Sequence, residues 1–279
     1  MSKKLQIVLG GTSGMGLATA IALGKFGPVL VGGRNQEKID KAVDALKKAK
    51  VEGYGKSVDI SDTKSLEEFV KYAKSIGNIG NVVNAAGVDQ GSSELIWKIN
   101  VQGTINVVEA FLPYIDGSCI VNYSSITGYF YKPSDEELDI WSKPNDKDFF
   151  EKSFKCTTTK ELDERMKFLG PQFLTYIASK RFVIYYTMAN ALRFGKKKSQ
   201  IFSVAPGSFD TPMLRESPEE AVKRIALGTA FGRLGKPEEM ADFIIKLLEP
   251  GHEYLTGVDF RWWKICTICC QTIWIINKF

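Results

Sequence analysis

A tyrosine and a lysine four positions apart are the residues of this chain best suited to proton transfer. Tyr176 and Lys180 open a predicted helix, and their i, i+4 spacing puts the phenol and the ammonium on one helix face. A free tyrosine titrates at about pH 10, so proton exchange at neutral pH requires the phenolate to be favoured by about 3 pKa units, or about 4 kcal/mol. A neighbouring cation provides that stabilisation. The alternative for this common spacing is a tyrosine packed under a lysine stem.

The histidine and the cysteines limit the other kinds of site that this chain can build. His252 is the single histidine and lies in an apparent turn, so a Ser-His-Asp triad has little support and a multi-histidine metal site is excluded. Cys266, Cys269 and Cys270 lie close together, but no second ligand pair exists for a metal or redox site. Acid–base chemistry must therefore fall to Tyr, Lys, Asp, Glu or Cys, and we expect no metal.

A glycine-rich segment joins the first predicted strand to the first predicted helix. Gly10, Gly14 and Gly16 follow the apolar run 5–9 and open a helix over 14–25. Glycine permits a tight turn and lets the backbone approach a pyrophosphate at the positive helix N-terminus. The spacing favours dinucleotide binding over a plain strand–helix turn. We expect the inner face of this helix to carry Leu17, Ala18, Ile21 and Ala22.

The end of the second predicted strand, 28–31, indicates which dinucleotide binds. A carboxylate at this place binds the ribose 2′-hydroxyl of NAD(H), whereas an arginine accommodates the 2′-phosphate of NADP(H). Here the strand is followed by two glycines and Arg34, with no carboxylate. We therefore expect NADP(H) rather than NAD(H). The alternative is that Arg34 is a solvated residue before the helix 36–48.

Short apolar runs alternate with helical patterns along the chain. Strands are predicted over 5–9, 28–31, 55–58, 81–84, 118–123 and 200–204. Helices are predicted over 14–25, 36–48, 64–75, 100–113, 175–194 and 237–248. Such alternation indicates right-handed βαβ units and a parallel sheet. The predicted fold class is α/β, a Rossmann-like doubly wound parallel sheet in a single domain.

The alternation breaks over residues 128–170. This segment is charged and aromatic, and it is too long for a simple loop. We interpret it as a partly helical insertion, with helices near 135–141 and 160–169, between the strand of Ser125 and the helix of Tyr176. We predict that it rims the substrate cleft, where its aromatic side chains would suit a bulky apolar carbonyl. The alternative is that these side chains pack the insertion itself.

The order of the motifs closely resembles that of the single-domain short-chain dehydrogenase/reductases. The match runs over about residues 4–260, at successive predicted strand ends. It consists of the glycine loop, Asn84-Ala-Ala-Gly87, Asn100, Ser124-Ser125, Tyr176 with Lys180, and Pro206-Gly207 with Thr211. The short segment 87–100 and the long gap between Ser125 and Tyr176 resemble the subgroup of 3-alpha-hydroxysteroid dehydrogenase/carbonyl reductases.

The resemblance implies a role for each matching catalytic residue. Tyr176 would donate a proton to the substrate oxygen during reduction, or accept one during oxidation. Lys180 would lower the pKa of Tyr176 and hold the nicotinamide ribose. Ser125 would hydrogen-bond the carbonyl, and Asn100 would anchor a water that relays protons. Taken singly, Asn100 and Ser125 could instead be helix and strand-end caps.

The resemblance also implies the cofactor-binding residues. Asp59 and Ile60 match the adenine-contacting pair, and Phe209 and Thr211 would bind the carboxamide and leave one nicotinamide face open for hydride transfer. The full set is Gly10, Thr12, Ser13, Gly14, Met15, Gly16, Arg34, Asp59, Ile60, Asn84, Ala85, Tyr176, Lys180, Pro206, Gly207, Phe209 and Thr211.

The C-terminal segment departs from the family pattern. Residues 255–260 resemble the final family strand, which usually continues Val-Asp-Gly-Gly, but here the chain continues Arg261-Trp262-Trp263-Lys264. Tryptophan has a single codon, so the neighbouring frame reads GAT GGT GGA, or Asp-Gly-Gly, if the arginine codon ends in GA. We hypothesise that residues 261–279 are an out-of-frame tail.

Length and composition describe an ordinary soluble globular chain. It has 279 residues, of which 44% are hydrophobic and 25% charged, and a formal net charge of +5. This length suits one large domain, and the charge is mild for nucleic acid. The chain has no secretory signal and no apolar stretch of about 18 residues, the length that a spanning helix needs. We expect a cytoplasmic protein with neither a nucleic-acid nor a membrane partner.

Together these features predict an oxidoreductase that transfers a hydride between NADP(H) and a secondary alcohol or ketone, with a bulky apolar or steroid-like carbonyl as a candidate substrate. The alternative is a catalytically impaired nucleotide-binding protein, a sensor or scaffold, on the same fold. The intact Ser125, Tyr176 and Lys180 favour the enzyme, whereas the aberrant tail favours the alternative. Many family members dimerise through the helix of the tyrosine and lysine. The insertion beside it makes the usual tetramer doubtful and leaves a homodimer open.

Overall fold

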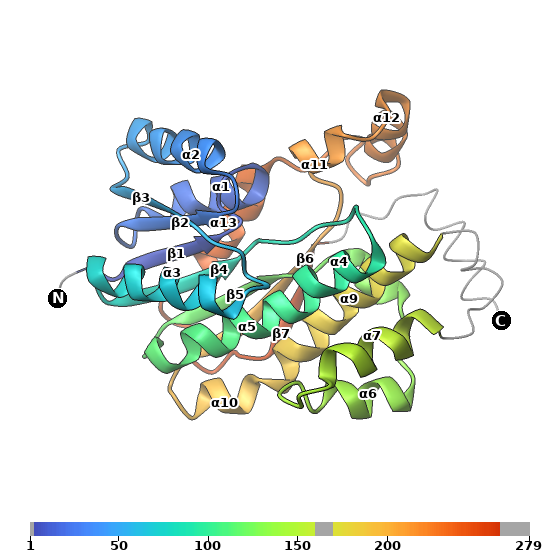
Figure 1. Cartoon of the computed structure of the whole chain (residues 1–279). Coiled ribbons are helices and arrows are strands. Elements are labelled where there is room, and N and C mark those ends of the chain that lie inside the picture. Colours follow the sequence, from blue (N-terminus) through green and yellow to red (C-terminus); the bar gives the residue numbers. More distant parts are fainter. Residues whose placement is uncertain (1–2, 160–169, 263–279) are drawn as a thin grey trace.

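Seven parallel strands form the centre of the structure, a computed structural model that describes residues 3–159 and 170–262 (Figure 1). The strands are β1 (Leu5–Leu9), β2 (Val29–Gly33), β3 (Gly53–Ser57), β4 (Ile79–Asn84), β5 (Cys119–Tyr123), β6 (Gln200–Pro206) and β7 (Val258–Trp262). Their order in the sheet is β3-β2-β1-β4-β5-β6-β7, so the direction of winding reverses between β1 and β4. This confirms the predicted doubly wound parallel sheet.

Helices cover both faces of the sheet (Figure 1). One face carries α1 (Gly14–Leu23), α2 (Gln36–Lys48) and α13 (Pro237–Leu247). The other carries α3 (Thr63–Ile76), α4 (Ser93–Trp97), the π-helical segment η1 (Lys98–Gln102), α5 (Gly103–Phe111) and α9 (Pro171–Ala189). Because side chains alternate along a strand, Ile7 and Leu9 pack under the second group of helices and Val8 under the first. All three are fully buried, as expected for a sheet covered on both faces.

Helix α1 approaches the sheet through small side chains. A Cβ atom at Gly16 would lie 2.2 Å from the carbonyl oxygen of Gly10, so glycine permits this close approach. The buried residues of the helix are Gly16, Thr19, Ala20 and Leu23. The predicted inner face is confirmed in part: Leu17, Ile21 and Ala22 pack against the core, but like Ala18 they are only partly buried. Helix α13 packs against α1 and covers one side of it.

The helix boundaries follow local signals in part. Helices α2 and α6 (Asp135–Trp141) span the predicted ranges, and the side chains of Asn35 and Ser134 cap them. The helix predicted over 100–113 begins earlier, at Ser93, and ends in the short 3₁₀ turn η2 (Leu112–Tyr114). The helix predicted over 175–194 begins at Pro171, and α10 (Ala191–Gly195) continues it.

The insertion packs onto helix α9. Besides α6 it contains α7 (Phe149–Thr159), which was not predicted. Trp141 and Phe149 are buried, and their ring centroids lie 5.4 and 5.8 Å from that of Phe182 in α9. The aromatic side chains of the described part therefore pack the insertion against α9, which corrects the prediction that they rim the cleft. The second predicted helix, 160–169, lies outside the described residues.

Strand β7 continues past Phe260 as far as Trp262. The Trp262 ring packs edge-on against Phe243 at 4.9 Å and against Phe209 at 6.2 Å, and its carbonyl accepts a hydrogen bond of 3.1 Å from the Gly207 amide. Arg261 and Trp262, the first two residues of the hypothesised tail, thus belong to the sheet. Residues 263–279 lie outside the described part of the chain.

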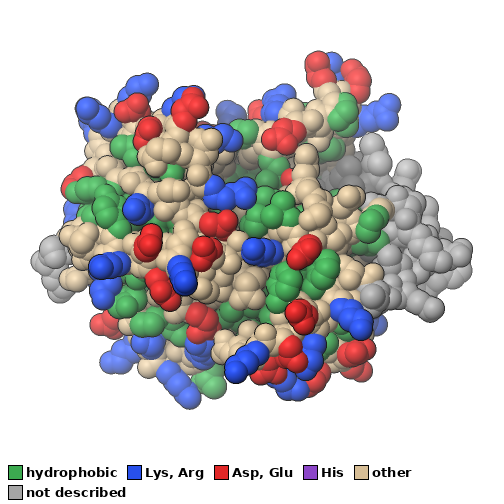
Figure 2. Space-filling model, in the orientation of Figure 1, with side chains coloured by type: hydrophobic (Ala, Val, Ile, Leu, Met, Phe, Trp, Pro, Cys, Tyr) green, Lys and Arg blue, Asp and Glu red, His purple; other side chains and the backbone are tan. Residues whose placement is uncertain are grey.

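Acidic and basic side chains alternate over the face of the molecule in Figure 2, without a broad patch of one sign. Within residues 3–159 and 170–262, no helix combines the length and the apolar character that a membrane span requires.

Candidate active site

Two adjoining cavities open where the carboxyl ends of the parallel strands meet. The first, the glycine-loop cavity, has a volume of about 330 Å³ and lies beyond β1 and β4, where the strand order reverses. The second, the tyrosine cavity, has a volume of about 230 Å³ and lies beyond β5 and β6. Sheets of this kind bind ligands at such a reversal point.

Most of the predicted cofactor residues line the glycine-loop cavity. They are Gly10, Thr12, Ser13, Gly14, Met15, Gly16, Arg34, Asp59, Ile60, Ala85 and Thr211. Gly10 has φ +74°, and a Cβ atom there would lie 2.6 Å from the amide nitrogen of Ala86. Glycine therefore lets the loop pack directly against the backbone of Ala85 and Ala86. The cradle that this loop forms beside the N-terminus of α1 fits an anionic pyrophosphate.

Two cations lie where the glycine-loop cavity meets the end of β2. Arg34 follows the strand, Lys38 lies in the first turn of α2, and both line the cavity. The side chain of Asn35 accepts a hydrogen bond of 2.9 Å from the Lys38 amide and so fixes the start of the helix. Lys38 was not predicted, although its i, i+4 spacing from Arg34 was a usable signal.

The remaining predicted site residues line the tyrosine cavity, with the exception of Asn84 and Asn100. Ser125 and Tyr176 line it and are hydrogen-bonded to one another. Ser125 follows β5 at the start of the turn η3 (Ile126–Phe130), and its Oγ accepts a hydrogen bond of 3.0 Å from the Thr127 hydroxyl. The other predicted residues that line this cavity are Lys180, Pro206, Gly207, Phe209, Met15, Ala85 and Thr211.

The Lys180 side chain is buried between the tyrosine and the strand end. Its Nζ donates a hydrogen bond of 3.0 Å to the backbone carbonyl of Tyr123 and lies 5.8 Å from the centroid of the Tyr176 ring. A Cβ atom at Gly87 would lie 3.1 Å from the same Nζ, so the glycine leaves room for the ammonium. The helix α9 thus brings the phenol and the ammonium to one cavity, as their spacing predicts.

Burial moves the two pKa values in opposite directions. Burial raises the pKa of Tyr176 to about 12, although the hydrogen bond with Ser125 lowers it. Burial lowers the pKa of Lys180 to about 8, although the charge of Asp89 raises it. The lowered pKa that we expected for Tyr176 is therefore not found, because desolvation of the phenolate raises the pKa by more than the hydrogen bond with Ser125 lowers it. Tyr176 is protonated at neutral pH and is suited to donate a proton.

Asn100 lies behind the cavity instead of lining it. Its side chain accepts a hydrogen bond from the Val88 amide and donates one to the Val88 carbonyl, each of 2.9 Å, and donates another of 3.0 Å to the Ser179 hydroxyl. It lies in the π-helical segment η1, a geometry frequent at functional sites. Through these hydrogen bonds Asn100 holds the backbone at Val88 close to Ser179 of α9.

Asn84 is the predicted cofactor residue that the structure places elsewhere. Its side chain is buried in the sheet, where Nδ2 lies 3.4 Å from Oδ1 of Asn122, and it lines neither cavity. Its own Oδ1 has no hydrogen-bond partner among the described residues. The prediction is corrected because Asn84 lies in register with Asn122 of β5, which contacts Thr187 of α9, so its side chain points from the sheet toward α9, whereas Ala85 lines the cavity.

A carboxylate in β7 ties the loop of Ser125 to the sheet. Asp259 accepts hydrogen bonds from the hydroxyls of Ser124 at 2.7 Å, Tyr129 at 2.6 Å, and Ser203. The Arg261 guanidinium lies 3.4 Å from the centroid of the Tyr129 ring. These contacts hold Ser124 and Tyr129, which lie on either side of Ser125 in the chain. No motif in the sequence indicates them.

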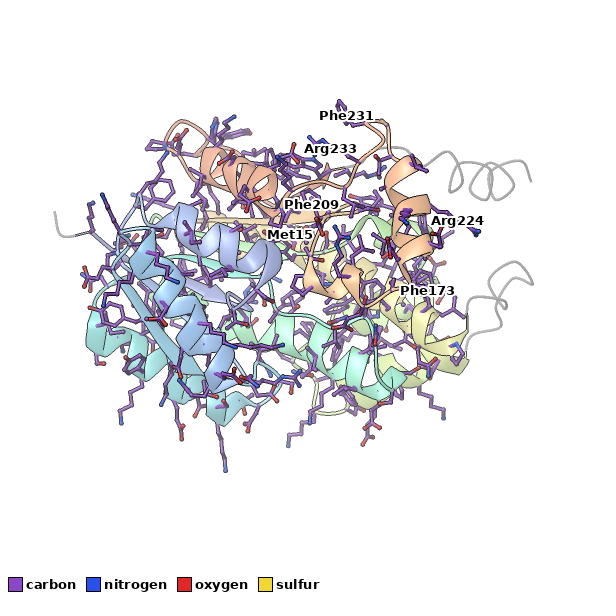
Figure 3. The ribbon with its side chains drawn as sticks, turned by 90° about the horizontal axis from the view of Figure 1, so that it is seen from above. Met15, Phe173, Phe209, Arg224, Phe231 and Arg233 are labelled. Carbon is purple, nitrogen blue, oxygen red and sulfur yellow. The ribbon has the colours of Figure 1, made fainter. Side chains whose placement is uncertain are left out.

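The segment between β6 and α13 covers the two cavities. It contains α11 (Pro212–Arg215) and α12 (Glu219–Leu227). From above, Met15 and Phe209 lie side by side near the middle of the molecule, and both line the tyrosine cavity (Figure 3).

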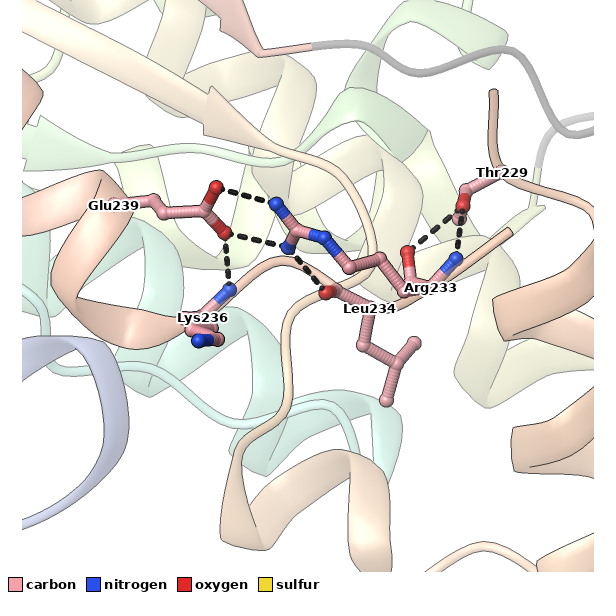
Figure 4. Close-up of polar contacts among 5 residues, drawn as sticks. All are labelled: Thr229, Arg233, Leu234, Lys236 and Glu239. Carbon is pink, nitrogen blue, oxygen red and sulfur yellow. Dashed lines mark hydrogen bonds and ion pairs between the residues drawn. The ribbon is translucent and has the colours of Figure 1, made fainter. Parts of the chain in front are cut away.

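Arg233 anchors the returning end of this segment. Its guanidinium donates to both carboxylate oxygens of Glu239, at 2.7 and 2.8 Å, and to the Leu234 carbonyl at 2.9 Å (Figure 4). Its backbone amide donates to the Thr229 hydroxyl at 3.1 Å.

Several lining residues have no signal in the sequence. In the tyrosine cavity they include Asp89, Ser208, Met213 and Leu214. Asp89 and Ser208 lie in irregular segments, and Met213 and Leu214 in the single-turn helix α11, where neither periodicity nor a motif indicates which side chains turn toward a ligand.

His252 lies far from Ser125 in the fold. It lines a separate cavity with Gln200, the first residue of β6, whereas Ser125 follows the last residue of β5. A triad of the two is therefore excluded. Within the described ranges no group of three or more His, Cys, Asp or Glu side chains could hold a metal ion, and Cys266, Cys269 and Cys270 lie outside those ranges.

Known proteins share this arrangement along most of the chain. A short chain dehydrogenase model matches residues 4–135, and an Enoyl-(Acyl carrier protein) reductase model matches residues 164–261. A 3-oxoacyl-[acyl-carrier-protein] reductase from Thermotoga maritima is 27% identical over 272 residues, which cover 91% of this chain and 94% of that protein. The chain belongs to the short-chain dehydrogenase/reductase family.

Further relatives agree with this assignment. A 3alpha-hydroxysteroid dehydrogenase from Mediterraneibacter gnavus is 26% identical over 275 residues, covering 92% of this chain and 94% of that one. A crystal structure of an actinorhodin polyketide ketoreductase variant with NADPH superposes with a TM-score of 0.72 at 25% identity, and covers 94% of this chain and 97% of that one. This short-chain dehydrogenase/reductase is an oxidoreductase that acts on CH–OH and keto groups with a nicotinamide cofactor.

Proposed function

We propose that this enzyme transfers a hydride between NADP(H) and a secondary alcohol or ketone at the tyrosine cavity. The observation that carries the proposal is that Ser125, Tyr176 and Lys180 line one cavity, which adjoins the glycine-loop cavity. The glycine loop lines that cavity beside the N-terminus of α1 and fits the pyrophosphate of a dinucleotide. When bound there, the nicotinamide supplies or accepts the hydride.

The chain itself orients the substrate and moves the proton. The hydroxyls of Ser125 and Tyr176 bind the carbonyl oxygen and stabilise its developing negative charge. Tyr176, protonated because burial raises its pKa to about 12, donates the proton to that oxygen during reduction. The Lys180 ammonium, held by the Tyr123 carbonyl, keeps a positive charge beside the phenol. Asn100 is a positioning residue, since it holds the backbone of Val88 against α9.

Preference for NADP(H) is supported by the charges at the end of β2. Arg34 and Lys38 line the glycine-loop cavity there, and an arginine at this place accommodates a 2′-phosphate. Asp59 and Ile60 line the same cavity and are proposed to contact the adenine. Phe209 and Thr211 are proposed to bind the carboxamide.

The substrate class follows from the lining of the tyrosine cavity. Met15, Phe209, Met213 and Leu214 present apolar surface beside the reacting groups. We propose a ketone or secondary alcohol with an apolar body, such as a steroid-like carbonyl.

The insertion supports a change in assembly from the usual family tetramer. Trp141 and Phe149 cover the outer side of α9 around Phe182, the helix through which many relatives dimerise. We propose that the chain is a monomer or a dimer that uses another face. We propose a cytoplasmic location, which is supported by Cys119, a buried thiol that donates a hydrogen bond of 3.1 Å to Gln200.

We propose that residues 261–279 are an out-of-frame tail, and re-sequencing of the gene tests this. An Asp-Gly-Gly reading in the adjacent frame after the codon of Phe260 is the expected result. A gene found intact, with no such reading, would remove the idea.

Loss of absorbance at 340 nm with NADPH and a panel of ketones tests the proposed function. We expect turnover by the wild type and a loss of at least about a hundredfold in Tyr176→Phe. Binding of NADPH without turnover of any ketone would instead support the alternative, a catalytically impaired nucleotide-binding protein.

A further inference from the structure

One carboxylate lies in the tyrosine cavity with no function in the proposed chemistry. Asp89 lines this cavity together with Ser125, Tyr176 and Lys180. It lies two residues beyond Gly87, in the irregular segment between β4 and α4, and it is partly buried. Its charge acts on both Tyr176 and Lys180, which shows how close it lies to the reacting groups.

The Asp89 side chain has no bonding partner from the rest of the described chain. Apart from its own backbone amide, no donor of residues 3–159 and 170–262 forms a hydrogen bond or ion pair with its carboxylate. Burial raises the pKa of Asp89 and the charge of Glu216 adds to this rise, whereas its own backbone amide and the charge of Lys180 lower it. A partly desolvated carboxylate without a partner is costly, and a cation or strong donor supplied by a ligand would relieve that cost.

No cation of the described chain forms a hydrogen bond or ion pair with Asp89. Lys180 is the one Lys or Arg among the described residues that line the tyrosine cavity; its charge lowers the pKa of Asp89, but its ammonium donates its hydrogen bond to the Tyr123 carbonyl. Arg215, on the segment that covers the cavity, pairs with Asp210 through two hydrogen bonds of 2.6 and 2.8 Å. A ligand can therefore supply the hydrogen-bond donor that the Asp89 carboxylate lacks.

We propose that Asp89 is a specificity-determining residue that binds a protonated amine on the ketone substrate. The apolar body of that ketone packs against Met213 and Leu214, which line the same cavity. A substrate with a carboxylate in the place of the amine is rejected, because two like charges then share one partly buried site. This inference rests on the proposed reduction of ketones.

Three ketones of closely similar shape test the inference. They are 4-(dimethylamino)cyclohexanone, which is cationic at pH 7, the neutral 4-isopropylcyclohexanone, and the anionic 4-oxocyclohexanecarboxylate. We expect the wild type to show a kcat/KM about tenfold higher for the amine than for the neutral ketone, as one charged hydrogen bond provides. The carboxylate should be the poorest of the three.

Substitution of Asp89 should remove this ranking. In Asp89→Asn the amine-to-neutral ratio of kcat/KM should fall to about one, and Asp89→Glu should retain part of it. Asp242→Asn is the matched control, since it removes an exposed carboxylate of α13 outside the cavity lining and should keep the ratio.

The outcomes separate this inference from the proposed function. Turnover of all three ketones without preference for the amine, or a preference that survives in Asp89→Asn, would overturn the role of Asp89 and leave the reductase standing. Failure of the wild type to reduce any of the three, or any ketone of the panel above, would overturn both.

Discussion

The Lys180 ammonium donates a hydrogen bond of 3.0 Å to the backbone carbonyl of Tyr123, the last residue of β5. This contact fixes a charged group at the strand end, one helical turn from Tyr176. Because burial lowers the pKa of Lys180 to about 8, the charge in the site changes within an accessible pH range.

We expect the rate of ketone reduction to fall as pH rises through about 8. Lys180 loses its proton there, whereas Tyr176, with a pKa of about 12, keeps its own. The measurement is kcat/KM from pH 6 to 10, which reports the groups of the free enzyme. In Lys180→Arg the fall should vanish, since a guanidinium stays charged. A wild-type profile that is flat up to pH 10 would contradict this account.

The same lysine makes folding stability depend on pH. Its pKa is about 8 in the folded chain and 10.5 when unperturbed, so between these values the unfolded state binds more protons and the free energy of unfolding rises with pH. Below pH 8 the buried charge costs about 3 kcal/mol. Lys180→Met should therefore raise the free energy of unfolding at pH 7 by about 1–2 kcal/mol after loss of one hydrogen bond. Urea titrations at pH 7 and 10 measure this change in the free energy of unfolding. A Lys180→Met variant that is less stable than the wild type at pH 7 would contradict the predicted cost of the buried charge.

Removal of both cations at the end of β2 should selectively weaken the binding of NADPH. We expect Arg34→Ala with Lys38→Ala to raise the Kd of NADPH at least about a hundredfold and to leave that of NADH nearly unchanged, because only NADPH carries the 2′-phosphate. Fluorescence titration with both cofactors measures this. Lys41→Ala is the control, since Lys41 pairs with Glu37 outside the cavity. Equal affinities for the two cofactors in the wild type would defeat the assignment.

Loss of the Asp259 charge should loosen the loop of Ser125. Asp259→Asn weakens the hydrogen bonds from Ser124 and Tyr129, and we expect the free energy of unfolding to fall by about 1–3 kcal/mol. Because Ser124 adjoins Ser125, kcat should fall more than the affinity for NADPH. Thermal unfolding and steady-state kinetics measure the two effects. Asp242→Asn, at an exposed position of α13, should change neither; equal losses of kcat and cofactor affinity in Asp259→Asn would argue against a local role.

Truncation of Phe182 should test how the insertion is held. This side chain is fully buried between Trp141 and Phe149, and we expect Phe182→Ala to lower the free energy of unfolding by about 3–5 kcal/mol. Met188→Ala on the same helix, where the side chain is 56% exposed, should cost little. Denaturant titrations compare the two. A cost of less than about 1 kcal/mol at Phe182 would show that the insertion does not depend on this contact.

The sequence by itself determined the parallel sheet, the glycine loop and the partnership of Tyr176 with Lys180. These features depend on short-range rules. Strand and helix periodicity predict the sheet, glycine permits the tight turn before the helix N-terminus, and an i, i+4 spacing puts two side chains on one helix face. The same rules placed α2 and α6 at their observed boundaries.

Only the tertiary structure decided which side chains meet across the sheet and how deeply they are buried. It turned the aromatic residues of the insertion toward Phe182, directed Asn84 toward α9, and brought Asp89 into the tyrosine cavity. It also raised the pKa of Tyr176 instead of lowering it. Burial is the sum of contacts from segments far apart in the chain, and desolvation follows burial, so neither quantity is carried by a local motif.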